Sequence, residues 1–215
     1  MGGFHLCEVS SKLKNMKKLI VIVLSVILVS LNSNKNQNIS LHSKSEKTIE
    51  NDALAYNISS SVNFENNHPY AKFCNDYQEI AIYYQIECGI PTSIQLAQAI
   101  AESGGGRSDI AKRSNNLFGM KYYKGLYSGD YYTSTSGTKW RKYNNFEDSF
   151  KDHAFFLHKF YLHAVGKDWT YWVKNCKGYG ANNYWEHIGM VIEKYKLWRY
   201  DNMVNEYQSN RSYNL

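Results

Sequence analysis

Apolar side chains recur at intervals of three or four residues through most of residues 70–195, and this periodicity constrains the fold more than any other feature. Residues 70–88 carry an amphipathic helical pattern, which Gly89 is expected to end as a C-terminal cap. Further helices are predicted at residues 91–103, 108–112, 145–160 and 184–195, together with a Trp-rich segment at 168–176. The Tyr- and Thr-rich stretches 131–135 and 138–143 flank a Ser-Gly pair, which predicts one β-hairpin. The fold class is therefore mainly α (α+β), with a small β-hairpin lobe.

The first 31 residues carry the features of an export signal. Lys17 and Lys18 precede an apolar run over residues 19–31, as in the charged and apolar regions of a secretory signal peptide. The run is shorter than the roughly 20 residues of a typical membrane span. We therefore predict a signal peptide region at 1–31, with Met16 as an alternative start. The other interpretation is an uncleaved anchor, which would be the protein's only contact with a membrane.

The rest of the chain divides by composition and periodicity into three parts. Residues 32–68 are rich in Asn, Ser and Lys, which predicts a flexible spacer with a weak helical turn around residues 48–56. Periodicity then begins, so residues 69–201 are predicted to form one domain. Residues 202–215 are expected to be a C-terminal tail.

Charge and residue counts exclude several classes of protein. Lys and Arg number 25 against 19 Asp and Glu, a net charge of +6 without the basic stripe or motif of a nucleic-acid-binding protein. Cys74 and Cys88 would lie about 21 Å apart on one helix, too far to form a disulfide. His153, His158 and His163 recur every five residues, whereas zinc sites on helices need a spacing of four. We therefore expect a monomer without metal or cofactor.

Glu102 stands out among the carboxylates on physical grounds. It ends an apolar helical pattern, and three glycines follow one residue later. The negative end of a helix dipole and an apolar surrounding both disfavour ionisation, so the pKa of Glu102 is expected to rise, as a general acid requires. The alternative is an exposed glutamate at a helix end, with Gly104 as the cap.

A series of motifs follows in order around Glu102. They read AIAESGGG (99–106), NNLFGMK (115–121), WRKY (140–143), DSFKDH (148–153), GYGANNY (178–184) and LWRYD (197–201). Taken together they resemble the glucosaminidase family, glycoside hydrolase family 73, whose members cleave the glycan strands of bacterial peptidoglycan. The resemblance covers residues 69–201, and the match at 178–184 is the loosest.

The resemblance implies a lysozyme-like helical domain whose hairpin lobe covers a glycan groove. It implies that Glu102 is the general acid that protonates the oxygen of a GlcNAc–MurNAc linkage. Tyr184 matches a tyrosine near the scissile bond and is the second catalytic candidate. The substrate-binding candidates that it implies are Phe118, Asn116, Tyr179 and Trp140. The implied partner is therefore the peptidoglycan strand, outside the cytoplasmic membrane in the periplasm, cell envelope or extracellular space.

The sequence departs from the family where many members carry a second acidic residue in the hairpin lobe. Here the only carboxylate of that segment is Asp130, at the base of the hairpin. Glycosidases normally need a second group, as nucleophile or as base for water. Asp130 could supply it, the N-acetyl group of the substrate could act as nucleophile, or Tyr184 could stabilise the intermediate. We favour the N-acetyl group assisted by Tyr184.

Two other functions compete with a hydrolase. A lytic transglycosylase on the same fold uses one Glu and forms an anhydro product, but its G-L-M-Q motif is replaced here by NNLFG. A non-catalytic glycan-binding protein would use the aromatic residues as stacking platforms and keep Glu102 as a remnant. The intact ESGGG motif around Glu102 argues against that alternative.

Overall fold

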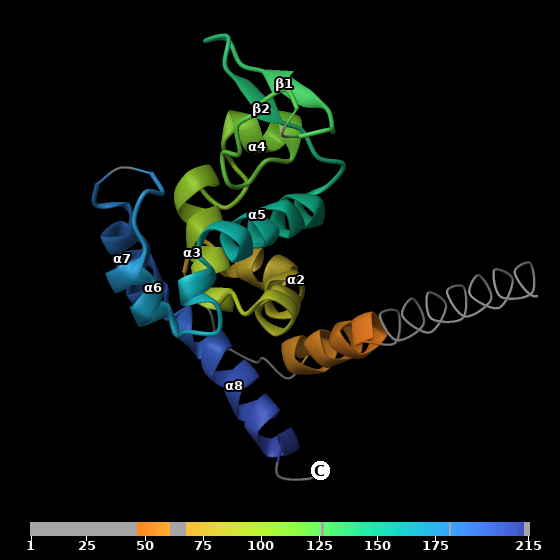
Figure 1. Cartoon of the computed structure of the whole chain (residues 1–215), viewed down its shortest axis with the longest axis vertical. Helices are drawn as coiled ribbons and strands as arrows, with labels where there is room; N and C mark the ends of the chain where they lie inside the picture. Colours follow the sequence, from red (N-terminus) through yellow and green to blue (C-terminus); the bar gives the residue numbers. More distant parts are fainter. Residues whose placement is uncertain (1–46, 61–67, 126, 181, 213–215) are drawn as a thin grey trace, which may run out of the picture. The chain divides into compact units, whose positions relative to one another are not determined.

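The computed structural model describes residues 47–60, 68–125, 127–180 and 182–212 (Figure 1). The predicted signal peptide region at 1–31 lies outside these residues, as do residues 32–46 and 61–67 of the predicted spacer. The chain divides into two compact units, Met1–Glu50 and Asn51–Leu215, and everything below concerns the second unit. Within the described ranges, no helix has the length and apolar character needed to cross a bilayer.

Helices make up most of the second unit, with one two-stranded sheet between them. In chain order they are α2 (Ala71–Cys88), α3 (Thr92–Ser103), α4 (Asp109–Ser114), β1 (Tyr131–Thr133), β2 (Lys139–Arg141), α5 (Phe146–Phe160), the 3-10 turn η1 (Leu162–Ala164), α6 (Trp169–Asn175), α7 (Tyr184–Tyr195) and α8 (Trp198–Ser212). The strands pair antiparallel, with Tyr132 opposite Trp140. The predicted class, mainly α with a small hairpin lobe, is confirmed.

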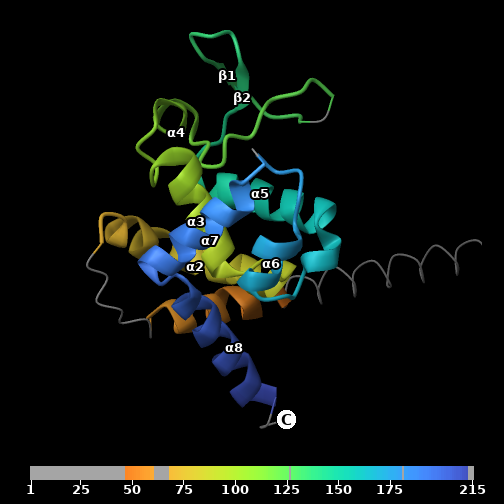
Figure 2. The same cartoon turned by 90° about the vertical axis from the view of Figure 1, so that its left-hand side faces the viewer.

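Helix α3 is buried around almost its whole circumference. It packs against α2, α7 and α8, and Figures 1 and 2 show it running through the middle of the helices. Most of its side chains are small or apolar, which is typical of a helix inside a core, and the buried Gln95 amide donates hydrogen bonds to the carbonyls of Ala81 and Ile90. Gly104 ends it in a left-handed conformation, with its N–H bonded to the Ile100 carbonyl. The sequence therefore places the C-terminal end of a central helix beside the hairpin lobe.

Two helices begin or end at the capping residues that the sequence predicted. Gly89 ends α2 at φ 67°, and its N–H donates to the Gln85 carbonyl at 3.0 Å. Asn145 begins α5, accepting a hydrogen bond at 2.8 Å from the Asp148 N–H. The cysteines Cys74, Cys88 and Cys176 are buried and free, so the prediction that the first two do not pair is confirmed.

In the second unit, residues 51–60 are helical, so the helix extends past the weak helical turn that was predicted around residues 48–56 of the spacer. Leu54, Ala55 and Ile58 form one apolar stripe that packs against Ile82 of α2 and Val204 of α8. Three apolar residues among polar ones are too few to predict a packed helix from periodicity. The residues that they pack against lie on helices distant in the sequence. The full extent of the spacer and the boundary at residue 69 stay predictions.

The chain also remains helical beyond the predicted end of the domain at residue 201. Helix α8 continues to Ser212, so residues 202–212 of the predicted tail are helical. Asp201 anchors this helix, since its carboxylate accepts hydrogen bonds from the N–H (2.8 Å) and the hydroxyl of Ser93. It thereby caps the N-terminal end of α3 from another helix. Burial raises the pKa of Asp201 to about 7.

Candidate active site

Glu102 lies one residue before the end of α3, followed by a turn of three glycines with positive φ. Ser103 holds this turn together, because its hydroxyl donates to the Ala99 carbonyl and accepts from the Gly106 N–H at 2.8 Å. A Cβ on Gly105 would come within 2.8 Å of the Tyr70 ring. The turn can therefore pack this closely only with glycine at that position.

Gly119 faces the Glu102 carboxylate across a narrow space. Its φ is +60°, and a Cβ built on it would lie 3.6 Å from Oε2 of Glu102 and 3.8 Å from the Trp140 ring. The loop after α4 and strand β2 therefore bring Gly119 and Trp140 to the end of α3. The missing side chain leaves room beside the carboxylate, as a ligand bound there would need.

The pKa of Glu102 is raised, as the sequence predicted. Desolvation by the surrounding protein is the largest cause, while a hydrogen bond from Tyr184 and the charge of His187 partly offset it. The Glu102 side chain is nonetheless exposed to solvent, so a ligand can reach it. A carboxyl group that is reachable and reluctant to ionise can donate a proton near neutral pH.

Tyr184, the first residue of α7, joins Glu102 to a residue that the sequence analysis missed. The Gln98 amide donates to the Tyr184 hydroxyl at 3.1 Å, which leaves the phenolic proton free to bond to the Glu102 carboxylate. Burial strongly raises the pKa of Tyr184, so this hydroxyl stays protonated. Gln98 precedes Glu102 by four residues and shares its helix face, and that spacing was the signal that could have found it.

Tyr179 packs beside Tyr184, with ring centroids 4.8 Å apart. Its hydroxyl lies 3.3 Å from Nε2 of His153 and 3.5 Å from the Phe118 carbonyl. Phe118 stacks on the His153 ring at 3.8 Å and is only 2% exposed. The Phe118 ring therefore belongs to the core behind Tyr179 rather than to the surface of a groove, where the resemblance had placed it.

The three regularly spaced histidines of α5 and η1 do not converge. His153 is fully buried, which lowers its pKa to about 3 and keeps the imidazole neutral. His158 bonds through Nδ1 to the Cys88 carbonyl at 3.0 Å, and His163 is exposed. In the part of the chain that the structure describes, no three His, Cys, Asp or Glu side chains gather as a metal site requires.

Asn116 is buried and bonds only to backbone groups. Its amide donates to the carbonyls of Met120 (2.8 Å) and Arg141 (3.0 Å), and its side-chain oxygen accepts from the Met120 N–H. These bonds tie the loop that carries Gly119 to strand β2. The Asn116 side chain is thus bonded within the protein, whereas the resemblance predicted a substrate-binding residue.

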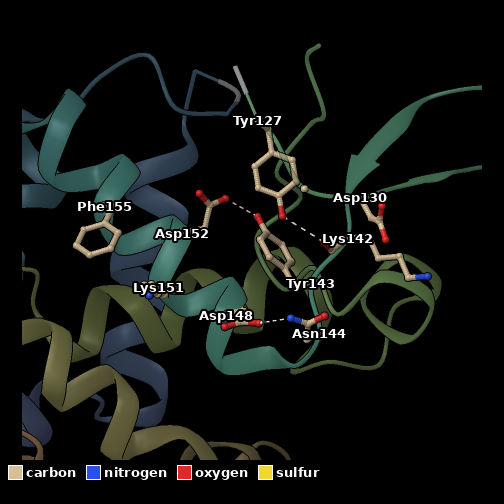
Figure 3. Close-up of a pocket in the computed structure, with 10 residues that line it drawn as sticks. Tyr127, Asp130, Lys142, Tyr143, Asn144, Asp148, Lys151, Asp152 and Phe155 are labelled. Carbon is tan, nitrogen blue, oxygen red and sulfur yellow. Dashed lines mark hydrogen bonds between the residues drawn. The ribbon is translucent and has the colours of Figure 1, made fainter. Parts of the chain in front are cut away.

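Asp130 lines a pocket beside the hairpin (Figure 3). The pocket is lined by Tyr127, Gly129, Asp130, Lys142, Tyr143, Asn144, Asp148, Lys151, Asp152 and Phe155. Glu102 is not among them. The structure thus places Glu102 beside Gly119 and near Trp140, and it places Asp130 in the lining of this pocket.

Known proteins share this sequence pattern. A family model for glucosaminidases, described as mannosyl-glycoprotein endo-beta-N-acetylglucosaminidase, matches residues 78–197, more than half of the chain. Exo-glucosaminidase LytG of Bacillus subtilis (strain 168) is 34% identical over 131 aligned residues, and the match covers 51% of this chain and 45% of LytG. Protein bax of Escherichia coli (strain K12) is 58% identical over 36 residues, covering 17% of this chain and 13% of that protein. The matches thus span less than half the length of these relatives.

Solved structures share the fold. The peptidoglycan hydrolase from Sphingomonas sp. A1 superposes with a TM-score of 0.52 at 23% identity, covering 60% of this chain and 91% of that one. The glycoside hydrolase domain of FlgJ from Salmonella typhimurium gives 0.50 at 24% identity, with coverages of 69% and 100%. At these identities the likeness concerns the fold, and it confirms the predicted lysozyme-like architecture.

Proposed function

Because this chain belongs to the glucosaminidase family, we propose that it is an exported peptidoglycan hydrolase that cleaves the β-1,4 bond between GlcNAc and MurNAc. The observation that carries this proposal is the Glu102 carboxyl group, which is reachable from solvent and whose pKa is raised by desolvation, with Tyr184 among the groups that influence it. The name of the 34% identical relative, an exo-glucosaminidase, supports the same chemistry. Export follows from the predicted signal peptide region and from the location of peptidoglycan outside the membrane.

Glu102 is the proposed general acid. Its protonated carboxyl group donates to the glycosidic oxygen as the bond to the leaving sugar breaks. The carboxylate that forms then accepts the hydrogen bond from Tyr184, whose hydroxyl is fixed by Gln98. The absent side chain of Gly119 leaves that side of the carboxylate uncovered, and Trp140 offers an aromatic face against which a sugar ring can pack.

The substrate's own N-acetyl group is the proposed second catalytic group. Asp130, the only carboxylate of the hairpin segment, lines a different pocket, so no second carboxylate of the lobe accompanies Glu102. The N-acetyl oxygen of the substrate attacks the anomeric carbon as the bond to the leaving sugar breaks, which forms an oxazolinium ion, and the neutral Tyr184 hydroxyl stabilises the charge that develops. Water, deprotonated by the Glu102 carboxylate, then attacks the anomeric carbon, which restores the N-acetyl group and the protonated Glu102. Tyr179 supports the Tyr184 ring from behind.

Tyr184→Phe is therefore expected to lower kcat by about 10- to 100-fold with little change in KM, because only a hydroxyl acting in the transition state is lost. Asp130→Asn is the matched variant, and its kcat at saturating substrate should stay within about twofold of wild type, since it removes an exposed charge outside the site of bond cleavage. Release of soluble muropeptides from purified peptidoglycan measures both. A large loss in Asp130→Asn with an unaffected Tyr184→Phe would reverse the two assignments.

The chain ends produced from purified peptidoglycan test the function itself. Mass spectrometry after digestion by the full chain should find new reducing GlcNAc ends. Anhydro-MurNAc ends would instead identify a lytic transglycosylase, the alternative that a site with a single carboxylate favours. If the full chain produces neither kind of new end, it does not cleave glycan, and the remaining interpretation is a glycan-binding protein.

A further inference from the structure

The pocket beside the hairpin is lined by residues from the base of the hairpin and from α5, and Glu102 is not among them. Successive residues of a strand point to opposite faces, and here Trp140 approaches Gly119 while Arg141 pairs with Asp152 of α5 at 2.6 Å. The cavity has a volume of about 360 Å³. It is therefore a separate site next to the groove, large enough for a few amino-acid side chains.

The floor of this pocket is built of paired groups. The Asp152 carboxylate accepts hydrogen bonds from the Arg141 guanidinium and from the Tyr143 hydroxyl. The guanidinium also stacks over the Tyr127 ring at 4.8 Å, and the Tyr127 hydroxyl donates to the Lys142 carbonyl. These groups have their partners, so the floor is rigid and contributes no unbalanced charge.

The rim carries two cations and two anions that make no ion pair within the described ranges: Lys142, Lys151, Asp130 and Asp148. In Figure 3, Asp130 and Lys142 lie on the hairpin side of the two tyrosines, while Asp152 and Phe155 lie on the α5 side. Phe155 is 49% exposed at the edge of the cavity. The pocket thus offers both signs of charge and one apolar surface.

The two lysines, two aspartates and one exposed phenylalanine ring of the pocket limit which ligands can bind there. A polyanion would be repelled by the aspartates and a polycation by the lysines, and an uncharged sugar would use neither. A short peptide that carries carboxylates, an ammonium group and alanine methyls would use all three features. Peptidoglycan strands bear such peptides on every MurNAc, and four or five residues can extend about 13–18 Å.

We propose that this pocket, defined by Lys142, Lys151, Asp130, Asp148 and Phe155, binds the stem peptide of the strand whose glycan lies at Glu102. The inference rests on the proposed function and names its substrate as the peptide-bearing strand. Binding of the peptide adds affinity next to the cleft and favours linkages beside a substituted MurNAc. Glycan stripped of peptides is then a poorer substrate.

The test compares intact peptidoglycan with the same glycan after an N-acetylmuramoyl-L-alanine amidase has removed the peptides. The full wild-type chain should cleave the intact strands about fivefold faster at substrate concentrations below KM. Lys151→Ala/Phe155→Ala should abolish this preference and leave the rate on stripped glycan unchanged. Lys159→Ala/Phe160→Ala, an equivalent exposed pair on α5 outside the pocket, should keep it. Equal rates of wild type on both substrates overturn the inference.

A binding measurement separates the inference from the proposed function. The labelled tetrapeptide L-Ala-γ-D-Glu-L-Lys-D-Ala should bind the full chain, as measured by fluorescence anisotropy. Lys151→Ala/Phe155→Ala should weaken binding at least about fivefold, whereas Glu102→Gln should not. Binding without any glycan cleavage keeps the inference and overturns the proposed function. Absence of peptide binding overturns the inference and leaves glycan cleavage untouched.

Discussion

Replacing Glu102 with glutamine is expected to lower kcat by about 10²–10⁴-fold, because the amide keeps the size of the side chain but has no proton to give. KM should change little, since the substitution leaves the neighbouring Gly119 and Trp140 in place. The release of soluble muropeptides from purified peptidoglycan measures the loss.

The raised pKa of Glu102 adds a second expectation for the wild type. Its activity should persist above the pH at which an ordinary glutamate has lost its proton, and fall once Glu102 ionises.

Glu186→Gln is the matched control for this substitution. Glu186 is an exposed residue of α7, so the same chemical change there should leave the rate within about twofold of wild type. The far-ultraviolet circular dichroism spectrum of Glu102→Gln should match that of the wild type, because Glu102 makes no contact on which the helix depends. A Glu102→Gln protein that retained a tenth or more of wild-type activity would assign the acid to another residue.

The elements that the sequence predicted correctly are those fixed by local chemistry. Gly89 ends α2 and Asn145 begins α5 because the residues within one turn of each satisfy the free backbone groups. The position of Glu102 at the end of a buried helix followed from the same kind of signal. A periodicity of three to four residues is likewise local, and it located α7 to the residue.

What the sequence could not supply depends on contacts between distant segments. The stack of Phe118 on His153 joins a loop to α5, and it turned a predicted groove residue into a core residue. The bond between Gln98 and Tyr184 joins residues that lie 86 positions apart. Asp130 could be assigned to the active site or to another pocket only once the direction of the hairpin was known. Spacing along the chain does not determine any of these.

Asp201→Ala is expected to lower the free energy of unfolding by about 2–4 kcal/mol. The buried N–H and hydroxyl of Ser93 would lose their acceptor, and the N-terminal end of α3 would lose its cap. Urea unfolding followed by circular dichroism measures the change. Asn202→Ala is the matched control, since Asn202 is the exposed neighbour on α8 and should alter stability by less than about 0.5 kcal/mol.

Asp201→Asn separates the hydrogen bonds of this carboxyl group from its charge. The folded-state pKa of about 7 lies above the unfolded value near 3.9, so between these values the folded protein holds a proton that the unfolded chain has released. The contribution of Asp201 to stability is therefore complete below about pH 4 and falls as the pH rises through 7. Asparagine keeps an acceptor for the Ser93 N–H and does not ionise, so its stability relative to wild type should improve between pH 4 and pH 8. Other titrating groups cancel in that difference, and a difference that stayed constant with pH would show that Asp201 is ionised in the folded protein throughout.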